Sequence, residues 1–234
     1  MRVISACLLS FLIISLAVFP VFAHTEYDLP KVTQEQIAEA MQNTIPLRFL
    51  PSHPIYFLLQ IKEYVNRLFQ PSSAKRAQFD SVLATKRVKE SYLMLEKNDT
   101  KKASKSLKRY SQRIEKMVRQ IEKARSQNQD VVPLVSRIAE DLKNHETFLS
   151  ETVSKWQLMK DEYNFDQNLT LATNSFTKAV YAIDNIKPGL KDRFKLSNTS
   201  QESEVEDQTP ATPSANPSEI FQSSPSAKPR RIIY

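Results

Sequence analysis

The sequence predicts an all-α protein, because helical periodicity runs through most of the chain and the residue that builds tight β-turns is nearly absent. The 234 residues contain one glycine, Gly189, and glycine is the usual residue of two-residue hairpin turns. Phosphate-binding loops, dinucleotide fingerprints and the nucleophile elbow also need glycine at fixed positions. We therefore expect a helical bundle that lacks these catalytic motifs.

The first 23 residues predict a secretory signal peptide. Arg2 precedes an apolar run from Leu8 to Phe22, and Ala23 completes a Val-Phe-Ala cleavage site of the kind that signal peptidase recognises. The run is short for a membrane span, which needs ~20 apolar residues. Cleavage is therefore favoured over an uncleaved anchor, and no transmembrane span is expected afterwards. The predicted location is secreted or extracytoplasmic, in association with the cell envelope.

Three regions follow from composition and periodicity: the signal peptide over 1–23, a helical bundle over 24–189 and a disordered tail over 190–234. The tail is rich in Ser, Thr, Pro, Asn, Gln and Glu, a composition that buries too little apolar surface to fold. The only cysteine, Cys7, lies in the predicted signal peptide. The bundle must therefore be stabilised by its core, without disulfides.

Two short helices open the predicted bundle. Thr33 and Gln36 have capping-box spacing and predict a helix to about Thr44. Ser52 is the expected N-cap of the second helix, with Pro54 in its first turn. Aromatic residues at helical spacing usually pack in a core, so core packing is favoured over a ligand groove for the aromatic group of this region. The group consists of Phe49, Tyr56, Phe57, Tyr64 and Phe69.

Four longer helices follow. The first begins at Ser72 or Ser73 with Ala77, Ala84, Val88, Tyr92 and Leu95 facing inward, and the second is capped by Asp99. In the last three, apolar residues alternate steps of three and four, which is the pattern of coiled-coil seams. The first seam is Ala103, Leu107, Tyr110, Ile114, Met117, Ile121 and Ala124. The second is Val131, Val135, Ile138, Leu142, His145, Leu149, Thr152, Trp156, Met159 and Tyr163. The third is Leu169, Ala172, Phe176, Ala179, Ile183 and Ile186. Short loops join them, so we expect a long, coiled-coil-like antiparallel hairpin within the bundle.

The clearest candidate binding surface is a ladder of positive charge at i, i+4 spacing, formed by Lys101, Lys105, Arg109 and Arg113. Each like-charged pair at this spacing costs a helix ~0.2–0.5 kcal/mol, so an offsetting interaction is expected. One candidate is an anionic envelope component or an acidic protein partner. The other is the acidic helix expected over 130–162, which an antiparallel hairpin would place beside the ladder. Internal pairing is favoured because charged faces of bundle helices are usually structural.

Two blocks resemble the bacterial family known as domain of unknown function 5667. The first is LPSHPIY at 50–56 with Glu63, and the second is ATKRVKE at 84–90 with KND at 97–99. The resemblance covers residues 50 to about 120, and Leu59 stands where the family often has a lysine. Members are helical domains outside the cytoplasm, beside a signal peptide or membrane helix. The resemblance implies a secreted bacterial helical domain and supplies no activity.

The residues of these blocks predict an architectural role. Leu50, Pro51 and Pro54 set an extended approach and a helix start, which leads to Tyr56. A second group, Glu63, Arg87 and Glu90, has the charges to form ion pairs between the second and third helices. Arg87 and Glu90 are also three residues apart on one helix, a spacing at which side chains meet.

No catalytic or metal-binding constellation is recognisable, and no cofactor is expected. The three histidines lie far apart in the sequence, without the i, i+3 or i, i+4 spacing of metal ligands. We therefore expect a non-catalytic extracytoplasmic binding or scaffold module, with a helical chaperone or stress sensor as the alternative and an enzyme third. The absence of a binding motif argues against nucleic acid as partner. A homodimer through the seams is left open, since heptads do not specify which chain supplies the partner helix.

Overall fold

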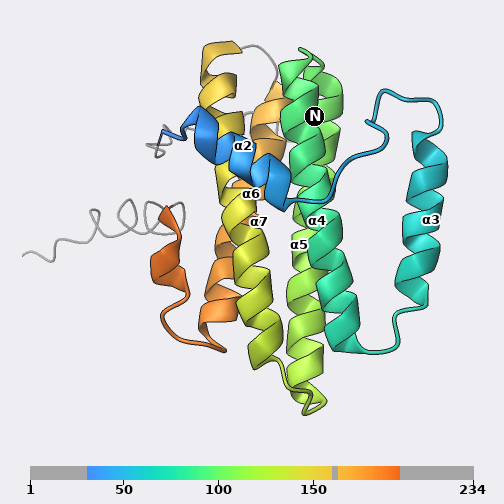
Figure 1. Ribbon diagram of the computed structural model, residues 1–234, viewed down its shortest axis with the longest axis vertical. Coiled ribbons are helices and arrows are strands. Elements are labelled where there is room, and N and C mark those ends of the chain that lie inside the picture. Colours follow the sequence, from blue (N-terminus) through green and yellow to red (C-terminus); the bar gives the residue numbers. More distant parts are fainter. Residues whose placement is uncertain (1–30, 160–162, 196–234) are drawn as a thin grey trace, which may run out of the picture.

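The structure, a computed structural model, describes residues 31–159 and 163–195, which form helices and no strand (Figure 1). The helices are α2 (Gln34–Asn43), α3 (Tyr56–Leu68), α4 (Ser73–Glu96), α5 (Thr100–Ser126), α6 (Val132–Met159), α7 (Tyr163–Asp184) and the 3₁₀ helix η1 (Lys191–Arg193). The prediction of an all-α bundle is confirmed. The predicted signal peptide over 1–23 and the predicted tail from residue 196 onward lie outside the described residues.

The four long helices pack as a ring in the order α4, α5, α7, α6, so that α5 and α6 occupy opposite corners. The long antiparallel hairpin is formed by α4 and α5, which lie side by side along their lengths (Figure 1). The expected placement of the acidic helix α6 beside the basic helix α5 is therefore wrong. The short loop between these two helices crosses the end of the bundle instead of joining neighbours.

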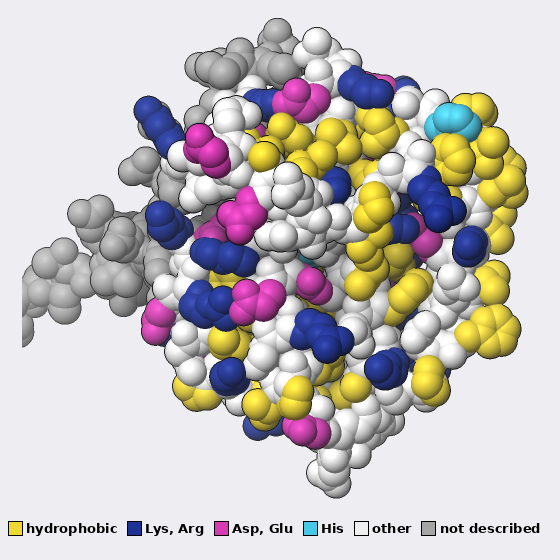
Figure 2. Space-filling model, viewed as in Figure 1, with side chains coloured by type: hydrophobic (Ala, Val, Ile, Leu, Met, Phe, Trp, Pro, Cys, Tyr) yellow, Lys and Arg dark blue, Asp and Glu magenta, His cyan; other side chains and the backbone are white. Residues whose placement is uncertain are grey.

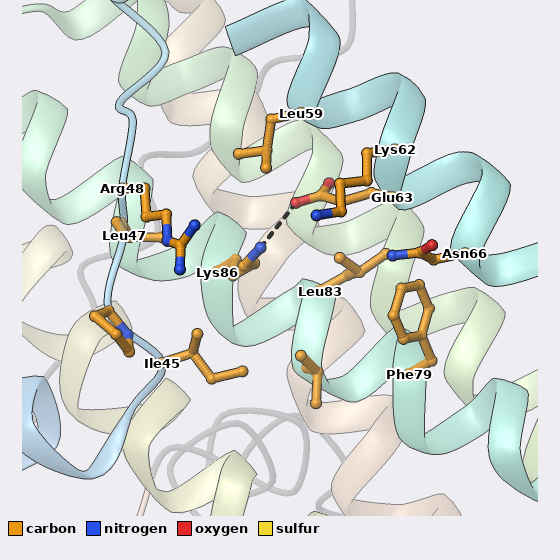
Figure 3. A pocket seen from close by; sticks show the side chains of 12 residues that line it. Ile45, Leu47, Arg48, Leu59, Lys62, Glu63, Asn66, Phe79, Leu83 and Lys86 are labelled. Atoms are coloured by element: carbon orange, nitrogen blue, oxygen red, sulfur yellow. Dashed lines mark hydrogen bonds and ion pairs between the residues drawn. The ribbon is translucent and has the colours of Figure 1, made fainter.

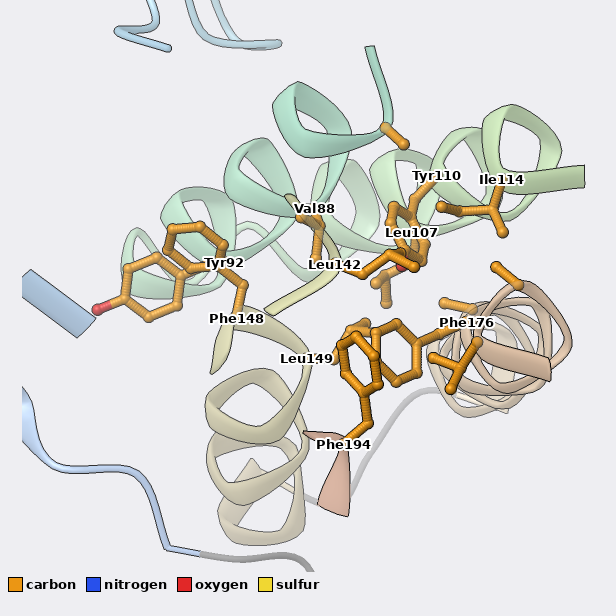
Figure 4. Packing of buried hydrophobic residues seen from close by; sticks show 14 of the residues in the cluster. Val88, Tyr92, Leu107, Tyr110, Ile114, Leu142, Phe148, Leu149, Phe176 and Phe194 are labelled. Atoms are coloured by element: carbon orange, nitrogen blue, oxygen red, sulfur yellow. The ribbon is translucent and has the colours of Figure 1, made fainter. Parts of the chain in front are cut away.

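The predicted seams build the core between the four helices (Figure 4). All seven predicted seam positions of α5 are buried, as are those of α7 from Leu169 to Ile183. His145 is also fully buried, with its Nε2 2.7 Å from the Thr85 hydroxyl and its Nδ1 3.4 Å from the Tyr110 hydroxyl. A buried polar ring with hydrogen-bond partners is a stable arrangement, so His145 is a core histidine.

Most helix starts are the predicted ones. Thr33 and Gln36 form the complete capping box of α2, Ser72 accepts a bond from the Lys75 N–H, and Asp99 accepts one from the Lys102 N–H. The start at Ser52 is wrong, because α3 begins at Tyr56. Two successive turns precede it, closed by bonds from the His53 N–H to the Leu50 carbonyl and from the Tyr56 N–H to the His53 carbonyl.

The bundle continues past the predicted boundary at residue 189. Gly189 has a φ of +88°, which suits glycine after a helix, and it turns the chain back toward the core. Leu190 and Phe194 are buried, and the Phe194 ring meets the Phe176 ring edge-on at 5.7 Å. These two apolar residues close the core beside α7, and η1 spaces them apart.

Candidate functional site

Helix α3 is attached to α4 by a buried charge cluster, which consists of Tyr56, Glu63, Arg87 and Glu90. The Arg87 guanidinium forms an ion pair with Glu90 at 2.6 Å and a second one with Glu63. The Tyr56 hydroxyl accepts a bond from Arg87 and donates one to Glu90 at 2.6 Å. The predicted ion pairs of Glu63, Arg87 and Glu90 are therefore present, both between helices and along α4.

Burial shifts the protonation equilibria of this cluster. Desolvation raises the pKa of Glu90, although Arg87 and the Tyr56 hydroxyl act in the opposite direction. Desolvation and the nearby Glu90 carboxylate raise the pKa of Tyr56 above its ordinary value. Burial, the largest single influence, would lower the pKa of Arg87, but Glu90, Tyr56 and Glu63 together outweigh it and the net shift is upward. The cluster thus contains one guanidinium, and each of its other members is stabilised by contact with it.

Asp80 provides a second attachment, further along α3. Its fully buried carboxylate receives Arg67 of α3 at 2.8 Å and Arg113 of α5 at 3.1 Å. The hydrogen bond to Asp80 raises the pKa of Arg67. Asp80 therefore joins α3, α4 and α5 through two charge-assisted bonds.

The remaining motif residues bring the chain to Tyr56. Leu50 is half-buried and packs against the core, whereas Pro54 is exposed at the turn before the helix. Pro51 lies between them in the first turn. Their placement agrees with an architectural role.

The outer face of α3 is apolar and exposed to solvent, which corrects the predicted core packing of the aromatic group. Only Tyr56 of that group is buried; Phe57 is 59% exposed, Tyr64 61% and Phe69 78%, while Phe49 is half-buried. We define the outer face of α3 by its exposed apolar side chains, which gather along one edge of the molecule (Figure 2). They are Phe57, Leu58, Ile61, Tyr64, Val65 and Leu68.

The structure divides the basic ladder into two halves. Arg109 donates a 3.2 Å bond to Gln60 of α3 and lies 5.8 Å from the centre of the Tyr56 ring. Arg113 pairs with Asp80. Lys105 and Lys101, one and two turns from Arg109 toward the start of α5, are exposed. The first half of the predicted binding surface is thus exposed, whereas the second half contacts α3 through Arg109 and α4 through Arg113.

A pocket of about 370 Å³ lies between α3, α4 and the segment that leads from α2 to α3 (Figure 3). Its apolar lining consists of Ile45, Pro46, Leu47, Leu59, Phe79, Val82 and Leu83. Lys86 lines it as well and pairs with Glu63 at 3.1 Å. The pocket exists because α3 meets α4 through long polar side chains, which hold the two helices apart.

Sequence reasoning missed Asp80 and the outer face. A signal for Asp80 exists, since it stands three residues after Ala77 and four before Ala84, where an inward stripe continues with an apolar residue. A charge at such a position indicates a buried ion pair. The spacing of Phe57, Ile61, Tyr64 and Leu68 is helical, but periodicity does not say whether the stripe faces the core or solvent.

The described residues hold no group of three or more His, Cys, Asp or Glu side chains placed to bind a metal ion. Within the same residues, no helix has the length and apolarity needed to span a membrane. The arrangement around α3 offers apolar surface, cationic groups and a pocket, which are features of binding.

Residues 48–157 match the family model described as Domain of unknown function (DUF5667). The match confirms the predicted resemblance and extends it from the expected end near residue 120 through most of α6. It includes the whole buried charge cluster and the pocket residues from Arg48 onward. No curated protein and no solved structure matches the chain.

Proposed function

We propose that this chain, whose residues 48–157 belong to the domain of unknown function 5667 family, is a non-catalytic extracytoplasmic binding module that attaches to an anionic membrane surface. The observation that carries the proposal is the outward apolar face of α3. Helix α3 turns its polar residues Tyr56 and Glu63 inward and its apolar residues outward. Interfacial helices bind membranes by burying such a face at the headgroup boundary.

Charge supports an anionic surface as the occupant. Lys101 and Lys105 on α5 are exposed. Because Arg109 contacts Gln60 and Tyr56, the exposed part of the ladder begins beside the start of α3. A lysine near an anionic bilayer contributes about 1 kcal/mol. Apolar insertion and charge attraction would therefore act on the same side of the molecule.

Co-sedimentation with vesicles tests the proposal, using the chain from His24 to Tyr234. This form keeps every described residue and omits the predicted signal peptide. We expect binding to anionic vesicles, weakened by salt, and none to neutral vesicles. The double variant Ile61→Gln with Leu68→Gln should abolish binding. The matched control, Val132→Gln with Leu171→Gln, alters two apolar residues that are exposed elsewhere and should bind normally.

The contribution of the ladder is tested separately. Lys101→Gln with Lys105→Gln should lower vesicle binding roughly tenfold or more, at about 1 kcal/mol per lysine. The matched pair Lys123→Gln with Arg125→Gln removes the same charge from exposed positions at the other end of α5 and should have a smaller effect. Absence of vesicle binding would overturn the membrane proposal. A dimer in sedimentation velocity that the Ile61 and Leu68 double variant abolishes would identify a second copy as the occupant instead.

A further inference from the structure

The pocket between α3 and α4 is lined by more cationic side chains than the carboxylates nearby can neutralise. Arg48 and Lys62 line it together with Lys86, and the three side chains point toward a common space in Figure 3. Glu63 is the only carboxylate among the described lining residues, and it already pairs with Lys86 and Arg87. Arg48 and Lys62 form no ion pair among the described residues. The site therefore retains an excess of positive charge beside an apolar cavity.

The rest of the lining is mostly hydrocarbon. Ile45, Phe79 and Leu83 line the pocket around Lys86 (Figure 3). The volume of about 370 Å³ falls in the ~300–1,000 Å³ range of small-molecule sites. Apolar walls with a few convergent charged groups select a ligand that is apolar at one end and oppositely charged at the other.

We propose that the pocket between α3 and α4 binds a single-chain amphiphilic anion, with its carboxylate or phosphate head at Arg48 and Lys62 and its hydrocarbon chain against Phe79, Val82 and Leu83. Arg48 and Lys62, which form no ion pair within the described part of the chain, provide charge-assisted bonds for either head group. The inference is independent of membrane attachment, because the ligand enters the inner side of α3, whereas the membrane would contact its outer face.

Isothermal titration with dodecanoate and with dodecyl phosphate, below their micellar concentrations and without vesicles, tests this inference on the chain from His24 to Tyr234. We expect saturable binding of at least one of these probes, and the tighter one identifies the preferred head. Acetate, inorganic phosphate and dodecyltrimethylammonium should not bind measurably, since each lacks either the chain or the negative charge. Binding of the cationic amphiphile as tight as that of dodecanoate would overturn the inference.

Variants locate the site. Arg48→Gln with Lys62→Gln should weaken dodecanoate binding about tenfold or more through lost charge-assisted bonds. Lys101→Gln with Lys105→Gln, which removes equal charge outside the pocket, should leave it unchanged. Val82→Phe fills the cavity and should also reduce binding. Unaltered affinity in the Arg48 and Lys62 double variant would contradict the proposed site.

Methyl NMR separates this inference from the membrane proposal. Dodecanoate should shift the methyl signals of Ile45, Val82 and Leu83, which line the pocket, and leave those of Ile61 and Leu68 on the outer face in place. Shifts confined to Ile61 and Leu68 would overturn the pocket site. If dodecanoate shifts the pocket signals but the protein does not bind vesicles, only the membrane proposal is contradicted.

Discussion

Arg87 is the residue on which the attachment of α3 depends, since its guanidinium contacts Tyr56, Glu63 and Glu90. An apolar interface would tolerate the loss of one contact, because the remaining side chains still exclude water. A buried charge cluster does not, because each carboxylate that loses its cation remains desolvated. Stability at this site therefore rests on a single side chain.

Arg87→Leu should destabilise the protein by about 3–5 kcal/mol, the usual cost of breaking a buried ion pair. Urea unfolding followed by circular dichroism measures the change. Arg119→Leu is the control, because Arg119 is exposed and, within the described part of the chain, pairs only with Glu115 at 3.8 Å on its own helix. Its effect should stay within about 0.5 kcal/mol. Equal effects of the two substitutions would show that the cluster contributes no more than a surface pair.

His145 predicts a loss of stability in acid. Burial lowers its pKa from 6.5 to about 3 in the folded protein, so between these values the unfolded chain binds the proton first. The His145 contribution is complete above pH 6.5 and decreases as pH falls toward 3, with a slope of at most about 1.4 kcal/mol per pH unit. Urea unfolding at pH 7, 6, 5 and 4 measures it. His145→Gln should reduce the slope, whereas His53→Gln, at an exposed position, should keep it.

At the scale of elements, the sequence predicted the seams of α5 and α7 well and the orientation of α3 poorly. Seam residues such as Leu107, Tyr110 and Ile114 are buried because an amphipathic helix in a bundle packs its apolar face against the core. Helix α3 also has two faces, but its inward face is anchored by long-range ion pairs. Residues 34 positions apart, such as Tyr56 and Glu90, leave no periodic signal.

The candidate site, too, was predictable only in part. Glu63, Arg87 and Glu90 stand in the two family-like blocks, and their charges suggest the pairs that form. The inward position of Asp80 indicates a buried ion pair, but neither its partner on α3 nor the pocket was predictable, because both depend on the distance at which α3 stands from α4. That distance follows from side-chain lengths in the folded structure and from no local pattern.

The turn between α4 and α5 depends on Asn98, whose φ of +56° lies in the left-handed region. Asparagine tolerates this conformation better than other non-glycine residues. Asn98→Ala should destabilise the protein by about 1 kcal/mol, whereas Asn98→Gly should be neutral or slightly stabilising. Thermal unfolding followed by the fluorescence of the single tryptophan, Trp156, compares them. A more stable alanine variant would contradict the assigned conformation.

At the scale of the whole molecule, the ring order of the helices explains why the basic ladder does not meet the acidic helix. Because α5 and α6 lie at opposite corners, α4 and α7 separate their charged faces. Arg109 and Arg113 turn to Gln60 and Asp80, which lie on α3 and α4. Short loops alone do not decide which helices become neighbours in a four-helix ring, so the sequence left this choice open.

The same arrangement predicts uneven stability. Helix α3 contributes few buried apolar side chains, whereas α4 and α5 share the central core. Regions with few buried apolar contacts open locally at lower cost. In hydrogen exchange, amides of α3 should exchange faster than those of α4 and α5, and Arg87→Leu should accelerate α3 selectively. Equal protection of all three helices would show that α3 unfolds only with the bundle.

The division of α3 between an inner polar face and an outer apolar face also separates two kinds of constraint on sequence change. Substitutions at Tyr56 or Glu63 disturb the attachment of α3 to α4, so folding constrains which residues these positions tolerate. Substitutions at Ile61 or Leu68 alter only the binding properties of the exposed face, because neither residue packs into the core. Such a helix can acquire a new binding preference by mutation while the scaffold stays the same, which makes it a suitable starting point for redesigning specificity in the laboratory.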